Sequence, residues 1–181
     1  MYKTQDDISI LTADITGWDD EIGTFVVEHG QMSGSERLLS GESNAAVLYK
    51  STNISTYNLS AALNSANGDV TTAGDHTSAV AGDASGRSIT VDGAAVTSDS
   101  NTFIGTDITR LDIGKPDNNS NYLNGHIDRI TYYPTRLSHP ALTPLPARRT
   151  SPSRSAQSTH VLPDKAPQPP RRRRAAETPA R

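Results

Sequence analysis

Short runs of apolar and β-branched residues, each ended by turn-forming residues, recur along the first three-quarters of the chain. They occupy positions 24–32, 45–49, 54–63, 109–113 and 127–133. The first two runs lack the spacing of an amphipathic helix, and Gly, Asn, Asp and Ser separate the runs from one another. This pattern predicts β-strands joined by turns.

Two dipeptides predict hairpins. Asn67-Gly68 follows the third run, and both of its residues accept the positive φ that a two-residue hairpin turn requires. The segment 88–91 alternates polar with β-branched apolar residues and leads into Asp92-Gly93, after which an apolar pair continues the pattern. This second segment gives the clearest hairpin in the sequence.

The number and spacing of these runs indicate the fold class. About ten short strands at hairpin spacing, with no long amphipathic helix, predict an all-β sandwich or barrel of antiparallel strands. The one helix expected is about a single turn near Leu137, because Pro140 and Pro144 limit its length. No repeat of fixed period occurs, which disfavours propellers and solenoids.

Charge and proline divide the chain into two parts. Positions 1–135 hold seven Lys and Arg against eighteen Asp and Glu, a net charge of −11, whereas the remaining ten basic and two acidic residues give +8. Nine of the eleven prolines lie from Pro140 onward. We predict a folded domain over residues 1–138 and a disordered, basic, Pro/Arg-rich tail over residues 139–181, which has too few large apolar side chains to offset the entropy of ordering.

Other features exclude whole classes of chemistry. The chain has no cysteine, so it offers neither a disulfide nor a thiolate metal site. Its first residues do not form a basic-then-apolar signal peptide, and no run approaches the roughly 20 apolar residues that cross a bilayer. We expect neither a cleaved secretion signal nor a membrane partner.

Two stretches carry a family resemblance. The opening one reads D-I-S-I from Asp7, G-W at Gly17-Trp18 and E-I-G-T-F-V-V-E from Glu21, and the closing one reads R-L-D-I-G from Arg110, Y-L-N-G-H-I-D-R-I-T-Y-Y-P from Tyr122 and R-L-S from Arg136. Together they resemble the concanavalin A-like lectin/glucanase domain of bacteriophage tail and spike proteins, and the closing stretch is also similar to laminin-G-like jelly rolls. The resemblance covers positions 6–142 and implies a jelly roll of two antiparallel sheets. The Pro-Arg run beyond it departs from the family pattern and is typical of an altered reading frame or a read-through extension.

The resemblance also implies a role. It suggests a non-catalytic virion component, a phage or prophage tail fibre or spike domain, that is made in the bacterial cytoplasm and binds host-surface carbohydrate. Two alternatives stay open: a purely structural module that assembles with other virion proteins, and a glycoside hydrolase on a glucanase-like fold. Because homotrimers are common among phage fibres, a homo-oligomer also stays open, although the sequence does not show one.

The candidate ligand residues lie in the polar segment before the closing strand. A sugar site needs an aromatic face and a few well-placed polar side chains. Tyr122 lies beside Asn119 and Asn121, with His126 shortly after, so we predict that these four residues contact the ligand. Trp18, by contrast, belongs to the opening stretch and is expected to pack in the core.

Two acidic residues are candidates for a metal site. Asp112 and Asp117, followed by two Asn residues, can supply the oxygen ligands that Ca²⁺ prefers, although a turn between strands explains the same residues. No other cofactor is expected. The five histidines show no paired spacing, so no zinc site is expected either.

Catalysis and nucleic-acid binding are not expected. Hydrolysis in the β-glucanase branch of the fold uses two acids that straddle the sugar bond, but Glu28 is followed by His29 and Gly30 rather than by an acid at the alternate position. We therefore predict that the chain is not an enzyme. The four arginines at 171–174 are suited to binding the phosphates of a nucleic acid. No folded element that would recognise the bases accompanies them.

Overall fold

The computed structural model describes the strands and most of the turns of the body. The described residues are 8–41, 46–51, 53–57, 62–65, 70–103, 108–115 and 121–142. The predicted tail from residue 143 onward, the turn predicted at Asn67-Gly68 and the candidate residues Asp117 and Asn119 lie outside them.

A six-stranded antiparallel sheet forms one layer of the fold. Its order is β1 (Ile8–Leu11), β10 (Arg110–Ile113), β3 (Glu36–Gly41), β4 (Ala46–Lys50), β5 (Ile54–Tyr57) and β6 (Ala62–Asn64). The pairing of β3 with β4 contains two register shifts. Such irregularities bend a strand and change which face of the sheet a residue occupies.

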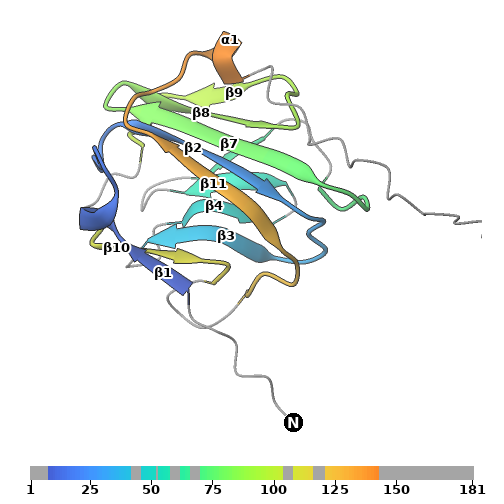
Figure 1. The fold of residues 1–181 in the computed structure, drawn as a ribbon. Helices are drawn as coiled ribbons and strands as arrows, with labels where there is room; N and C mark the ends of the chain where they lie inside the picture. The colour runs from blue at the N-terminus through green and yellow to red at the C-terminus, as the bar shows by residue number, and fades with distance from the viewer. Residues whose placement is uncertain are drawn as a thin grey trace, which may run out of the picture. The chain divides into compact units, whose positions relative to one another are not determined.

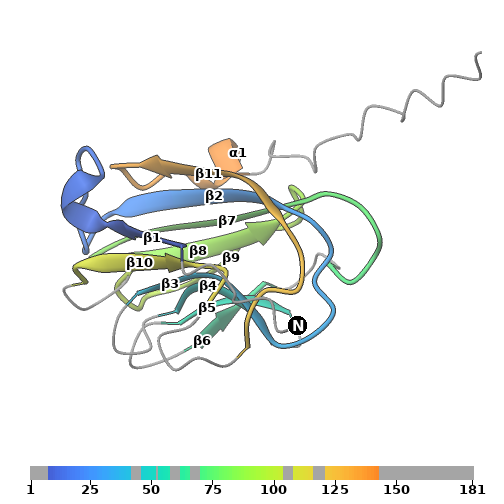
Figure 2. The same cartoon turned by 60° about the horizontal axis from the view of Figure 1, so that its bottom comes forward.

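A five-stranded antiparallel sheet forms the other layer. Its order is β11 (Ile127–Tyr133), β2 (Gly23–His29), β7 (His76–Asp83), β8 (Gly86–Val91) and β9 (Thr97–Asp99), and a 3-10 turn, η1 (Thr12–Asp14), lies between β1 and β2 in the chain. Figure 1 shows this sheet face-on, and Figure 2 shows the two layers one above the other. The predicted two-sheet antiparallel sandwich is confirmed.

The space between the sheets is filled by apolar side chains from both layers. Phe25 and Val27 of β2 meet Leu38 of β3 and Leu48 of β4, and all four are almost fully buried. Trp18 packs at one edge of this core, with its ring centroid 5.9 Å from that of Phe25. Burial of these chains supplies the main driving force for the sandwich.

One short helix covers part of the outer face of the five-stranded sheet. The helix α1 (His139–Leu142) is the single turn expected near Leu137, and it buries Leu142 against Val26 of β2 and Ala79 of β7. These four residues, which we assigned to the tail, therefore pack on the body. In the part of the chain that the structure describes, no helix is long and apolar enough to cross a membrane.

The turn predicted at Asp92-Gly93 follows β8. Both residues have positive φ, 51° and 69°, as that turn requires. The return strand, however, pairs with β8 only from Thr97 onward. The Asp92 carboxylate accepts the backbone N–H of Thr77, 2.7 Å away, so the turn is tied to β7 before the chain returns.

Candidate functional site

A small polar pocket lies at the rim of the six-stranded sheet, where β3 begins and β4 ends. We call it the rim pocket, and it is lined by Ser35, Glu36, Arg37, Tyr49, Lys50, Ser51 and Asn121. Its volume is about 140 Å³. That is below the roughly 300–1,000 Å³ of pockets that enclose drug-sized ligands, so it suits one charged group or part of a sugar ring.

Arg37 is the distinctive side chain of the rim pocket. It lies opposite Tyr49 in the β3–β4 pairing, and its Cζ is 5.6 Å from the centre of the Tyr49 ring, a cation–π contact. Among the described residues no carboxylate pairs with this guanidinium, and its Nη1 is buried without a hydrogen-bond partner. Burial lowers the pKa of Arg37 and the nearby Tyr49 opposes that shift, but an arginine stays charged in proteins.

The two other charged residues of the pocket, Glu36 and Lys50, form hydrogen bonds with neighbouring backbone groups. Glu36 is almost fully buried, and its carboxylate accepts backbone N–H groups from Ser33 at 3.2 Å and Gly34 at 3.0 Å. Lys50 donates from Nζ to the carbonyl oxygens of Gly34 and Ser51, each 3.2 Å away. These two side chains bind the backbone of the turn before β3, and Arg37 remains as the pocket cation without a carboxylate partner among the described residues.

The predicted ligand residue Asn121 lines the same pocket. Its backbone has φ of 56°, a left-handed conformation that Asn tolerates better than most residues. Its carbonyl oxygen accepts the backbone N–H of Arg37, 3.1 Å away. This bond holds the segment before β11 against β3 and places Asn121 beside the guanidinium.

The other two predicted ligand residues that the structure describes, Tyr122 and His126, do not line the rim pocket. Tyr122 is half-buried next to Asn121, and Asn119 lies outside the described residues. His126 is on another part of the surface, where its Nε2 lies 3.8 Å from carboxylate oxygens of Asp75 and Asp128. Of the three described residues among the four proposed from sequence, Asn121 alone lines the pocket.

The sequence offered Tyr49 as one of several aromatic residues on which a sugar could stack, but it did not indicate Arg37 or the contact between the two. They come from different strands and meet only through the β3–β4 register. An isolated arginine on a strand is most simply read as a solvated side chain. What distinguishes Arg37 is that no described carboxylate pairs with it, which the folded structure alone reveals.

The acidic residues singled out from sequence have ordinary structural partners. Asp112 is almost fully buried, and Arg110 donates from Nε to its Oδ1 at 2.9 Å and from Nη2 to its Oδ2 at 3.2 Å. Because Asp117 lies outside the described residues, the calcium site stays a prediction. Glu28 on β2 lies 3.4 Å from Nη1 of Arg129, an ion pair between neighbouring strands.

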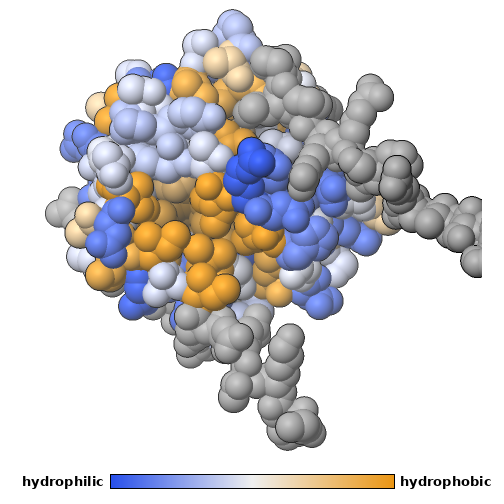
Figure 3. Space-filling model, viewed as in Figure 1, coloured by the Kyte–Doolittle hydropathy of each residue, from blue (hydrophilic) through white to orange (hydrophobic). Residues whose placement is uncertain are grey.

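An apolar groove opens on a different side of the sandwich, between the edge strands β1 and β11. This open-side groove has a volume of about 410 Å³ and is lined mainly by apolar side chains, namely Ile8, Ile113, Leu123, Ile127 and Ile130. Apolar residues surround a hollow on this face in Figure 3, and Ile8 and Leu11 are each 55% exposed. The groove suits an apolar partner better than a sugar, which needs aligned polar groups.

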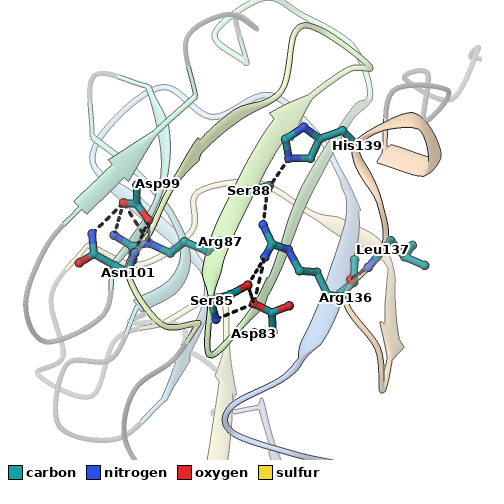
Figure 4. A network of polar contacts seen from close by, with 10 residues as sticks. Asp83, Ser85, Arg87, Ser88, Asp99, Asn101, Arg136, Leu137 and His139 are labelled. Atoms are coloured by element: carbon teal, nitrogen blue, oxygen red, sulfur yellow. Dashed lines mark hydrogen bonds and ion pairs between the residues drawn. The ribbon is translucent and has the colours of Figure 1, made fainter.

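A cluster that contains two arginines, Arg87 and Arg136, lies on the five-stranded sheet and next to α1 (Figure 4). Arg87 donates to Asp99 from Nε at 3.1 Å and from Nη2 at 3.0 Å, and Arg136 donates to Asp83 at 2.9 Å. His139 of α1 bonds to Ser88 at 2.8 Å. Carboxylates face both arginines here, so the cluster ties strands and helix together.

The comparisons with known proteins concern the fold. No family model matches the sequence, and no curated protein matches it. Among solved structures, the chain is similar to Trypanosoma rangeli sialidase in complex with sialic acid, with a TM-score of 0.52 and 17% identity over 68% of this chain and 22% of that one. It is similar to the NanB sialidase of Streptococcus pneumoniae, with a TM-score of 0.55 and 13% identity over 77% of this chain and 26% of that one.

A third similar structure matches most of its own chain. It is the CBM40 of the Ruminococcus gnavus IT-sialidase bound to alpha2,3 sialyllactose, with a TM-score of 0.52 and 18% identity over 68% of this chain and 81% of that one. At these identities the likeness establishes a shared lectin-like β-sandwich. The phage assignment stays an expectation, since these neighbours are sialidase structures.

One prediction needs correction. We expected from the sequence that the chain is not an enzyme, but two of the three similar structures described above are chains of sialidases, which are enzymes. The fold therefore does not support that exclusion. This chain spans only about a quarter of the length of those two sialidases.

Proposed function

We propose that this chain is a carbohydrate-binding domain whose rim pocket holds the carboxylate of an acidic sugar. The observation that carries the proposal is Arg37, a half-buried guanidinium without a carboxylate partner among the described residues, stacked on Tyr49. Taking a charge out of water is costly unless something pairs with it. An incoming carboxylate supplies that pair and accepts two parallel N–H bonds.

The other walls of the pocket suit the rest of a sugar ring. Asn121 offers an amide, Ser35 and Ser51 offer hydroxyl groups, and Tyr49 offers an aromatic face. The CBM40 with the same fold is bound to alpha2,3 sialyllactose, whose sialic acid carries a carboxylate at neutral pH. This neighbour supports an acidic glycan as the ligand.

A titration of the full chain tests the proposal. We expect alpha2,3 sialyllactose to bind and lactose, which lacks the carboxylate, to bind far more weakly by isothermal titration calorimetry. The change Arg37→Ala is expected to weaken sialyllactose binding by about 10- to 100-fold, because a hydrogen bond to a charged group contributes about 1.5–3 kcal/mol.

A matched control makes that test specific. Arg129→Ala removes an arginine of β11 that is 64% exposed and does not line the rim pocket, so binding is expected to stay at the wild-type level. Equal affinity for sialyllactose and lactose, or wild-type binding by Arg37→Ala, would refute the proposal. A glycan array with the same three proteins extends the test to acidic sugars other than sialic acid.

The finer proposal places this binding on a phage or prophage virion, where the domain attaches a tail fibre or spike to a host-surface glycan. It is supported by the resemblance of the opening and closing stretches. A role in virion assembly is the second candidate, and the open-side groove favours it because exposed apolar edge strands invite pairing with another chain. Both roles require the chain to be found by mass spectrometry in purified virions. Glycan binding by the purified chain then supports attachment, and its absence supports assembly.

A further inference from the structure

Three potential metal ligands meet on the surface beside the entry to β7 and β11. Asp75 directly precedes β7, His126 directly precedes β11, and Asp128 is the second residue of β11. His126 Nε2 lies 3.8 Å from Oδ1 of Asp75 and 3.8 Å from Oδ2 of Asp128, and one ligand atom from each residue lies within 4.8 Å of the other two.

The backbone holds His126 in a fixed place. The N–H of Gly30 donates to the carbonyl oxygen of His126, 3.0 Å away. A Cβ atom at position 30 would lie 2.4 Å from Cε1 of His126, so the imidazole lies directly against the backbone of Gly30. This contact leaves Nε2 facing the two carboxylates.

A β-bulge places Asp128 next to His126. In the pairing of β11 with β2, Ile127 lies opposite His29 and Arg129 lies opposite Glu28, which leaves Asp128 as the extra residue. Bulges re-aim a side chain without breaking the sheet, and they occur often near functional sites. His126 and Asp128 are two positions apart in the chain, and their ligand atoms lie close together at this irregular start of β11.

Asp75 is held by its neighbour in the chain. His76 is almost fully buried, and its ring bonds to Asp92 at 2.8 Å through Nδ1 and to the carbonyl oxygen of Thr72 at 3.1 Å through Nε2. These two bonds tie the turn before β7 to the turn after β8. The Asp75 carboxylate therefore reaches the cluster from a fixed backbone.

The distances fit a shared cation better than a hydrogen-bonded triad. At 3.8 Å the imidazole nitrogen is too far from either carboxylate for a hydrogen bond. Ligand atoms bound to one ion at about 2.0–2.2 Å lie up to about 4 Å apart, so small rotations of the exposed side chains His126 and Asp128 close the site. An imidazole with two carboxylates favours a zinc-like transition ion over Ca²⁺, which prefers oxygen alone.

We propose that Asp75, His126 and Asp128 bind one divalent transition-metal ion of the zinc class, with water in the remaining positions. The site is separate from the calcium pair predicted from sequence, and it shares no residue with the rim pocket. When bound, the ion cross-links the entry of β7 to the bulge of β11. Metal binding to the folded chain alone then raises its stability.

Calorimetric titration of the full, chelator-treated chain with ZnCl₂ tests the site. We expect one saturable binding event and a thermal unfolding midpoint that rises with Zn²⁺ concentration. CaCl₂ at the same concentrations is expected to give neither signal. The ¹⁵N resonance of His126 Nε2 should shift on Zn²⁺ addition, which reports the ligand directly.

Three variants decide the outcome. His126→Ala and Asp128→Asn change exposed side chains, so both are expected to fold and to lose the Zn²⁺ binding event, with affinity at least 10-fold weaker. His139→Ala removes a histidine of α1 and should bind Zn²⁺ as the wild type does. Binding that survives His126→Ala, an absence of saturable Zn²⁺ binding, or equal affinity for Ca²⁺ would overturn the proposal, while sialyllactose binding through Arg37 would be unaffected.

Discussion

Two arginines of this sandwich, one fully buried and one half-buried, differ in whether a carboxylate pairs with them. Arg87 on β8 is fully buried and donates to Asp99 on the neighbouring strand β9 through Nε and Nη2. Arg37 on β3 is half-buried, has Tyr49 as its neighbour, and has no carboxylate partner among the residues that the structure describes. A paired charge holds strands together, whereas an unpaired charge at a pocket is available to a ligand.

The difference follows from the sheets that carry the two residues. The five-stranded sheet is covered by the core on one face and partly by α1 on the other, so a charge there needs an internal partner. The six-stranded sheet opens at its rim into a pocket, where water or a ligand can meet a charge. The same substitution at both arginines should therefore separate structural from binding roles.

The largest expected effect is that of Arg87→Met. It leaves the Asp99 carboxylate without its main donor, and breaking a buried ion pair from one side costs about 3–5 kcal/mol. We expect about 3 kcal/mol here, because the Asp99 side chain keeps 25% exposure and water compensates in part. Urea unfolding measures the loss, and a loss below about 1 kcal/mol would contradict a structural role for the pair.

The next largest effect is a loss of stability in acid that is due to His29, a fully buried histidine of β2. Burial lowers its pKa, opposed by its bond to the Gly30 carbonyl. The unfolded chain therefore takes up a proton at higher pH than the folded one, and unfolding free energy should fall as pH drops below about 6.5, the usual value for histidine. Comparing urea unfolding at pH 7.5 and 5.5 in the wild type and His29→Gln checks this, since the variant should lose part of that slope.

A smaller change is expected for Arg136→Ala. Its partner Asp83 lies 2.9 Å away, but both side chains are partly exposed, 24% and 30%. Ion pairs of this kind contribute up to about 1 kcal/mol. The urea-unfolding loss should thus be well below that of Arg87→Met, and it should shrink in 1 M NaCl while the Arg87 effect persists.

The smallest effect on stability is expected for Arg37→Met. The long apolar chain of Met keeps the contact with Tyr49 and removes a desolvated charge, so unfolding free energy should change by less than about 0.5 kcal/mol. Binding of an acidic sugar should nevertheless weaken by about 10- to 100-fold, as for Arg37→Ala. A destabilisation comparable to that of Arg87→Met would mean that Arg37 is a structural residue and would remove the contrast between the two sites.

The local sequence was sufficient for the fold class and for part of the strands, but no predicted run covered β3 (Glu36–Gly41) or β7 (His76–Asp83). Alternation of polar and β-branched apolar residues over 88–91 predicted the strand observed there as β8, and the tolerance of Asp92-Gly93 for positive φ predicted the turn that follows it. Both depend on residues adjacent in the chain, whose backbone preferences hold in any fold. The role of Trp18 as a packing residue followed from its place in a recognisable motif.

Both proposed sites were decided by tertiary structure. Arg37 faces Tyr49 only because of the β3–β4 register, and Asp75 meets His126 and Asp128 only because the fold brings the turn before β7 to the start of β11. The sequence could indicate Asn121 because it lies in a polar segment. It could not indicate Arg37, which Asn121 meets only in the folded chain. Local preferences act between neighbours, whereas register and the pairing of charges are set by packing across the whole sandwich.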